Sequence, residues 1–206
     1  GANARFNIET VSESLFAKSR GYRLNYYAVT AELARVFLYA GKNAEAYAEA
    51  KKIIDEENKT GYFEASTNSS GFRNGNMKMY NDIIFGLYSS KELVEWDQEI
   101  NHGSDGASEE NYLCLDGDEI NSDWRFKYQL EEKYYGFYYR TLKYNKQTES
   151  TNEGKTNNRM LPMIRMSEVY YIAAEAIFDT KPKEARGYLE LVKKGRGISK
   201  KFDNVT

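Results

Sequence analysis

Residues 22–50, YRLNYYAVTAELARVFLYAGKNAEAYAEA, predict two helices joined by a short turn. Apolar residues in the first half recur at steps of three and four, which places them on one face of a helix. Gly41 supplies the left-handed residue that commonly ends a helix, and Asn43 can cap the helix that follows. We therefore expect a helical hairpin over about 21–58. Its first helix should face the core with Tyr22, Tyr26, Val29, Leu33, Val36, Phe37 and Ala40.

Two further features of this hairpin concern its surfaces. Alanines in the second helix let antiparallel helices approach closely, and we expect this helix to bury Ala46, Ala50, Ile53 and Ile54. Glu32 and Arg35 are three residues apart, so they can form an ion pair on the surface of the first helix.

A similar pattern near the end of the chain predicts a second hairpin over about 162–197. The residues after Pro162 predict a helix from Met163 to Phe178, Pro182 opens another helix, and Gly195 lies near its end. Both hairpins have the helix–turn–helix layout and the small residues of tetratricopeptide-like units. The residues expected to face inward here are Met166, Val169, Tyr170, Ala173, Ala176, Ile177, Ala185, Tyr188, Leu189 and Val192.

The segment between the hairpins, about 61–160, is a long insertion that is harder to assign. Residues 82–88 (DIIFGLY) predict a strand or a buried extended segment, and the tyrosines around 134–139 predict a strand pair or an exposed platform. Long segments with little regular structure are usually functional or disordered, and this many aromatic residues argue against disorder. We therefore expect the function to lie in this insertion.

The composition excludes several classes of protein. Lys and Arg number 29 against 31 Asp and Glu, so the basic surface of a nucleic-acid-binding protein is absent. No uncharged run approaches the roughly 18 residues of a membrane-spanning helix. One cysteine, Cys114, and one histidine, His102, argue against a disulfide framework, a multi-thiolate or histidine-rich metal site and a histidine-based triad. We expect no catalytic residue, no metal site and no cofactor.

The aromatic surplus, with 18 tyrosines and two tryptophans, is the unusual feature of the composition. These side chains combine an apolar face with a polar edge, which suits both sugar rings and protein interfaces. Trp96 and Trp124 stand between charged residues, and together with Tyr112 and Tyr135 they are the candidate ligand-binding residues. The alternative is that these aromatic side chains fill the core beneath long loops.

Two stretches resemble motifs of the SusD/RagB family. Arg23–Ala50 resembles a helical hairpin in which the pattern R-x-x-x-x-A-x-x-x-x-L-A-R-x-x-L-Y-x-G-x-x-x-x-A recurs. Leu161–Ala176 resembles a later helix, P-x-I-R-x-A-E-x-x-L-x-x-A-E-A, although Ser167 stands where alanine is usual and Tyr171 where leucine is usual. Residues 123–125 fall where members often carry an Asp-x-Arg step. The matching positions are Arg23, Ala28, Leu33, Ala34, Arg35, Leu38, Tyr39, Gly41, Ala46, Pro162, Ile164, Arg165, Glu168, Ala174, Glu175 and Ala176.

This resemblance implies a mainly α-helical fold in which tetratricopeptide-like hairpins form a scaffold and a loop-rich region carries the ligand site. Residues 1–206 would form a single SusD-like domain. The implied function is that of an outer-membrane lipoprotein at the cell surface, which captures oligosaccharides and delivers them to a TonB-dependent SusC-like transporter without turnover.

Members of the family also carry a signal peptide and a lipid-bearing cysteine near the mature N-terminus. The chain begins Gly1-Ala2 with neither. We therefore expect a truncated or central part of such a protein, attached to the membrane only through a lipid anchor missing from this chain.

Two other functions stay open. A tetratricopeptide-like scaffold would bind a protein or peptide in a helical groove lined by residues such as Tyr26 and Tyr47. A glycoside hydrolase would need two facing carboxylates about 5–10 Å apart, and nothing in the sequence marks such a pair.

Overall fold

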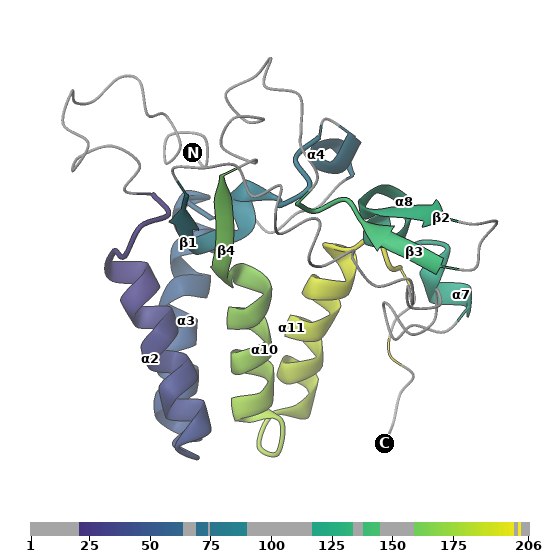
Figure 1. Ribbon diagram of the computed structural model, residues 1–206. Helices are drawn as coiled ribbons and strands as arrows, with labels where there is room; N and C mark the ends of the chain where they lie inside the picture. Colours follow the sequence, from purple (N-terminus) through teal and green to yellow (C-terminus); the bar gives the residue numbers. More distant parts are fainter. Residues whose placement is uncertain are drawn as a thin grey trace.

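The computed structural model describes residues 21–63, 69–73, 75–89, 117–133, 138–144, 159–199 and 202, and it is mainly helical. Four helices form its body and lie next to one another with similar axis directions (Figure 1). They come in two hairpins that are far apart in the sequence. The first hairpin is α2 (Tyr26–Tyr39) with α3 (Asn43–Thr60), and the second is α10 (Met166–Ile177) with α11 (Pro182–Lys194).

The first hairpin confirms the predicted turn, with two differences at the caps. Gly41 is left-handed at φ 71°, as expected. The α2 helix is capped by Asn25, whose side chain accepts a hydrogen bond from the backbone N–H of Ala28. The prediction that Asn43 caps α3 is wrong, because Asn43 is already helical and Lys42 precedes the helix without a side-chain cap.

The predicted inward face of α2 is also wrong for most of its residues. Tyr26, Val29 and Val36 are 66%, 52% and 51% exposed, and Leu33 is exposed as well. The buried side of α2 carries small residues instead: Ala28, Ala31 and Ala34 are fully buried, and Thr30 is 5% exposed. Small side chains let helix backbones approach closely, so the packed side of α2 is the alanine side.

The two hairpins stack directly on each other in space. Helix α10 packs against both α3 and α2, and α11 packs against α10. The predicted inward residues of α3, α10 and α11 are confirmed, with Ala176 and Leu189 only partly buried. One continuous core therefore runs through both hairpins, although about 100 residues of sequence separate them.

Polar contacts fasten one hairpin to the other. The Arg35 guanidinium donates to both carboxylate oxygens of Glu168 at 2.7 and 3.0 Å, and it also forms the predicted pair with Glu32 at 2.7 Å. Because Arg35 and Glu168 belong to the two separate motifs quoted above, this ion pair ties the motifs together. The Tyr47 hydroxyl likewise donates to Glu184 of α11 at 2.5 Å.

A short antiparallel sheet connects the helices to the insertion. Strand β1 (Ile83–Tyr88) pairs with β4 (Met160–Arg165), which confirms that DIIFGLY is extended. The prediction that the third helix begins at Met163 is wrong, because residues 160–165 are a strand and α10 begins at Met166. Proline and the residue before it favour extended backbone, and Pro162 faces Gly86 of β1.

The remaining elements come from the insertion and lie toward one end of the helices, with α7 beside the end of α11, as Figure 1 shows. Of the strand pair predicted around the tyrosines, the described residues on either side form an antiparallel ladder of β2 (Leu130–Lys133) and β3 (Tyr138–Thr141), whereas residues 134–137 lie outside the described residues. Among the described helices, none is long and apolar enough to cross a membrane. The other elements are α4 (Ser70–Arg73), η1 (Tyr80–Asp82), α7 (Gly117–Ile120), α8 (Trp124–Gln129), β2 (Leu130–Lys133) and β3 (Tyr138–Thr141).

Candidate ligand-binding site

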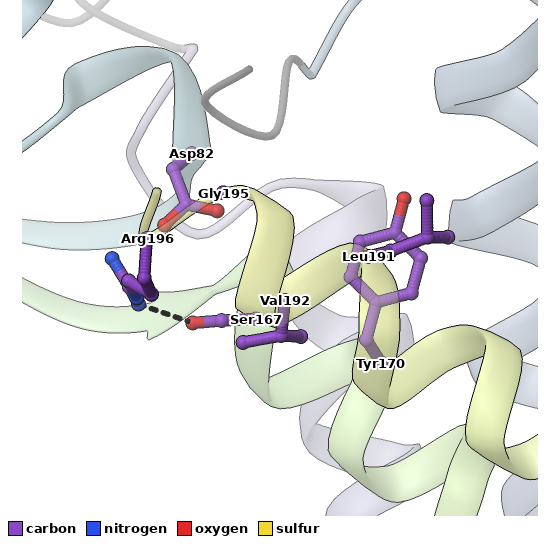
Figure 2. Close-up of a pocket in the computed structure, with 7 residues that line it drawn as sticks. All are labelled: Asp82, Ser167, Tyr170, Leu191, Val192, Gly195 and Arg196. Carbon is purple, nitrogen blue, oxygen red and sulfur yellow. Dashed lines mark hydrogen bonds between the residues drawn. The ribbon is translucent and has the colours of Figure 1, made fainter. Parts of the chain in front are cut away.

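A pocket lies where the insertion meets the second hairpin. It is formed between η1, the first turns of α10 and the end of α11, and Figure 2 shows its side chains. One side of the pocket is polar and the other is apolar. The lining residues are Asp82, Ser167, Tyr170, Leu191, Val192, Gly195 and Arg196.

Asp82 is the acidic group of the pocket. It is the last residue of η1 and directly precedes β1, and only 4% of its surface is exposed. Its carboxylate accepts a hydrogen bond of 3.3 Å from Arg165, which itself ends β4. Because a carboxylate offers about four acceptor positions, Asp82 retains capacity for hydroxyl donors of a ligand.

Arg196 is the basic group of the pocket and follows the end of α11. Its guanidinium lies beside Asp82 and donates to Ser167 Oγ at 3.4 Å (Figure 2). Its backbone oxygen accepts a hydrogen bond of 2.7 Å from the N–H of Trp124, which holds the segment after α11 against α8. Burial lowers the pKa of Arg196, and Asp82 partly offsets this effect.

Two lysines add to the positive charge near this pocket. Lys78 is 1% exposed, and burial followed by the charges of Lys143 and Arg165 lowers its pKa to about 7. Burial also lowers the pKa of Lys143 to about 8, with further lowering by Arg165 and Arg196 and an opposing effect of Asp82. Three basic side chains interact with Asp82, and Lys78 lies near two of them. We call these four residues the basic cluster: Lys78, Lys143, Arg165 and Arg196.

The apolar side of the pocket is held by the helix packing. Tyr170 is 4% exposed, and its hydroxyl donates to the Glu57 carboxylate of α3. That anchor fixes the tyrosine ring beside Leu191 in Figure 2. Charged hydrogen-bonding groups therefore lie on one side of this small pocket and apolar groups on the other, and it has room for a single polar group rather than for a whole ring.

Only one of the four sequence-predicted site residues lies among the described residues. Trp124 is half-buried at the start of α8, and its indole lies so close to Gly197 that a Cβ there would be 2.4 Å from Nε1. It therefore serves at least in packing α8 against the end of α11. Trp96, Tyr112 and Tyr135 lie outside the described residues, and all four stay predictions as ligand contacts.

The alternative function needs Tyr26 and Tyr47 to line one helical groove, but no contact among the described residues brings them together. Tyr26 is exposed on α2, whereas Tyr47 contacts Glu184 and Tyr188 of α11. For a hydrolase, Asp82 is the single carboxylate among the described residues that line the pocket. No group of three metal-ligating side chains occurs in the described part of the chain.

The pocket residues Asp82 and Arg196 are not among the site residues predicted from the sequence, and Ser167 stands out there only as a departure from a motif. A signal for the charged residues was present. Asp82 directly precedes an apolar run, Lys78 lies between two methionines, and Arg196 lies between two glycines. A single charged residue among apolar residues or glycines indicates a buried charge with a structural or functional role. It does not show which segments of the chain pack against each other.

The chain matches one protein family and several solved structures that share its fold. The SusD family model matches residues 1–203. A SusD superfamily protein of known structure from Bacteroides vulgatus ATCC 8482 is 25% identical with a TM-score of 0.64, over 89% of this chain and 43% of that one. A putative sugar binding protein from the same organism is 22% identical with a TM-score of 0.62, over 88% of this chain and 41% of the other.

Surface glycan-binding protein A from Bacteroides uniformis is 16% identical with a TM-score of 0.62, over 95% of this chain and 47% of that one. The chain thus spans less than half the length of these three solved structures. No curated protein matches the chain.

Proposed function

The chain belongs to the SusD family, and from that membership we propose that it is part of a cell-surface protein that captures oligosaccharides. It binds its glycan without cleaving it and delivers it to a TonB-dependent SusC-like transporter in the outer membrane. The glycan-binding protein from Bacteroides uniformis and the sugar binding protein from Bacteroides vulgatus share its fold, which supports this proposal.

The observation that carries the proposal is the pocket at the junction of scaffold and insertion. Asp82 accepts hydrogen bonds, Arg196 donates them, and Ser167 can do both. A sugar hydroxyl that enters this small pocket needs this mixture of donors and acceptors, while the rest of the sugar would lie outside it. The scaffold holds these groups on separate elements that are fixed by core packing.

The proposal is tested by screening the purified chain on a glycan array and titrating the best oligosaccharide by calorimetry. We expect saturable binding and, after incubation, an unchanged sugar by mass spectrometry. Asp82→Asn keeps the shape of the side chain and should weaken binding about tenfold, the effect of losing one charge-assisted hydrogen bond. Asp179→Asn, on an exposed turn, is the matched control and should bind as the wild type does.

Cleavage of the sugar would overturn the binding-protein proposal, and so would the absence of binding across the array. Delivery needs a separate experiment, in which the chain is tested for co-purification with a SusC-like transporter. Trp96→Ala and Trp124→Phe, titrated beside the wild type, test the predicted stacking residues.

The alternative, a scaffold for a protein or peptide partner, is favoured by one observation. The exposed apolar residues of α2, among them Val29 and Val36, form a stripe on the helix side opposite its buried alanines. Val29→Glu should abolish binding of such a partner and leave glycan binding unchanged. If Val29→Glu leaves the binding of every protein or peptide partner unchanged, the scaffold alternative fails and the pocket remains the candidate site of capture.

A further inference from the structure

Helix α2 carries apolar residues on two opposite sides. Its alanine side is buried against α3 and α10. On the other side, exposed apolar residues recur at steps of three and four along the whole helix. A helix that is apolar on both sides is normally packed on both sides, so this surface indicates a further neighbour. We call it the α2 stripe: Tyr26, Val29, Leu33, Val36 and Ala40.

The described elements that pack against α2 leave the stripe exposed. They are mainly α3, α10, β1 and β4. The chain also has twenty residues before Gly21, which lie outside the described residues. Tyr22 is buried, and its carbonyl oxygen accepts a hydrogen bond of 2.8 Å from the Gly86 N–H of β1. Residues 1–20 are therefore attached to the scaffold close to the N-terminal end of the stripe.

The sequence of residues 1–20 matches the stripe in its spacing. Read backwards from residue 15, apolar residues stand at 15, 11, 8 and 4, at steps of four, three and four. Read forwards from residue 29, the stripe continues at 33, 36 and 40 with the same steps. Such steps place residues on one face of a helix. An antiparallel arrangement then pairs Leu15 with Val29, Val11 with Leu33, Ile8 with Val36 and Ala4 with Ala40.

Length and charge fit the same arrangement. A helix over residues 4–18 would span about 22 Å, and α2, with its 14 residues, spans about 21 Å. Residues 19–25 remain for the connection, and helices that pack against each other are usually joined by about two to eight residues. The charged residues Arg5, Glu9 and Glu13 fall on the side of such a helix that faces away from α2.

We propose that residues 4–18 form a helix that packs antiparallel to α2 and covers the α2 stripe. Burial of the apolar residues on both helices stabilises the contact. The stack of hairpins is thereby extended by one helix on the outer side of α2. The inference is independent of the proposed function, and it assigns the stripe to a contact within the chain. A protein or peptide partner then reaches the stripe only by displacing residues 4–18.

Cysteine cross-linking tests the contact and its register. The background is Cys114→Ser, which removes the one native thiol. A short bis-maleimide should join Val11→Cys to Leu33→Cys within one chain. Glu13→Cys with Leu33→Cys is the matched control, because Glu13 lies on the far side of the proposed helix. The control pair should be joined about tenfold more slowly, since its effective concentration is lower.

Thiol labelling gives a second measurement that needs no cross-link. In the same background, the thiol of Leu33→Cys should react slowly with a maleimide, because the proposed helix covers it. Adding Val11→Glu places a charge in the contact and should speed the labelling about tenfold. Thr10→Glu, which adds the same charge beside the contact, should leave the labelling rate close to that of Leu33→Cys alone. Circular dichroism establishes that each variant is folded.

Three outcomes would overturn the proposal. The first is equal cross-linking of the Val11 and Glu13 pairs to Leu33→Cys. The second is fast labelling of Leu33→Cys that Val11→Glu does not change. The third is a cross-linked product with the mass of two chains, which would show that a second copy covers the stripe.

Discussion

The Lys78→Met substitution should flatten the rise of stability with pH between pH 6 and pH 9. Lys78 is almost fully buried, and its pKa is lowered to about 7 by burial first and then by Lys143 and Arg165. In the unfolded chain the pKa returns to its ordinary value of about 10.4. Between the two values the unfolded state binds more protons than the folded state, so the wild type becomes more stable as the pH rises.

The magnitude follows from the lowered pKa. Each pH unit between the two pKa values contributes about 1.4 kcal/mol to the free energy of unfolding. From pH 6 to pH 9, Lys78 alone should therefore contribute about 3 kcal/mol, nearly all of it above pH 7. Methionine keeps most of the length of the side chain and removes the charge, so this contribution disappears in the variant.

Urea unfolding followed by circular dichroism, at one-unit steps from pH 6 to pH 9, measures the effect. The difference in unfolding free energy between wild type and Lys78→Met should grow with pH by about 3 kcal/mol. Lys183→Met, which alters an exposed lysine of α11, should give a curve parallel to that of the wild type. A parallel curve for Lys78→Met as well would refute the electrostatic account of the basic cluster.

Gly197→Ala should lower the free energy of unfolding by about 2 kcal/mol or more, because φ is +83° there and the new Cβ would lie 2.4 Å from the Trp124 indole nitrogen. Gly187 lies inside α11 with nothing within 4 Å of a new Cβ, so Gly187→Ala should raise the free energy of unfolding by about 0.5–1 kcal/mol. Equal effects of the two substitutions would contradict both the strain at Gly197 and the helix stabilisation at Gly187. A double-mutant cycle of Arg35→Gln and Glu168→Gln should give a coupling of about 1 kcal/mol, and purely additive losses would show that the pair does not join the hairpins.

Much of the helical scaffold is predictable from local patterns. Gly41 and Pro182 mark a turn and a helix start because their backbone preferences are intrinsic to the residue. The buried side of α10 follows from the spacing of its apolar residues. That the two hairpins stack is not visible in either pattern alone, since the contact of Arg35 with Glu168 joins residues 133 positions apart.

The orientation of α2 shows where periodicity misleads. Its large apolar residues define one stripe and its alanines another, and hydrophobicity alone favours the stripe that begins with Tyr26. The helix buries the alanine stripe because α3 and α10 approach it closely there. The fit between small side chains and the neighbouring helices determines which side of α2 is buried. The sequence of α2 alone does not reveal that α3 and α10 are these neighbours.

The candidate site was the least predictable part. Trp124 is the predicted aromatic ligand contact that the structure describes, and its indole packs against Gly197, whereas Asp82 and Arg196 line the pocket and were not predicted. These two residues are 114 positions apart in the chain and meet only because β1 pairs with β4 at the start of α10. When the residues of a pocket come from distant segments, each segment of the sequence shows only one isolated charged residue, which is a weak signal.

A crystal structure of the chain with its best-binding oligosaccharide tests the central claim most directly. We predict an intact sugar over the mouth of the pocket, with a hydroxyl group within hydrogen-bonding distance of Asp82 and Arg196. A sugar bound elsewhere on the chain, with this pocket empty, would contradict the claim.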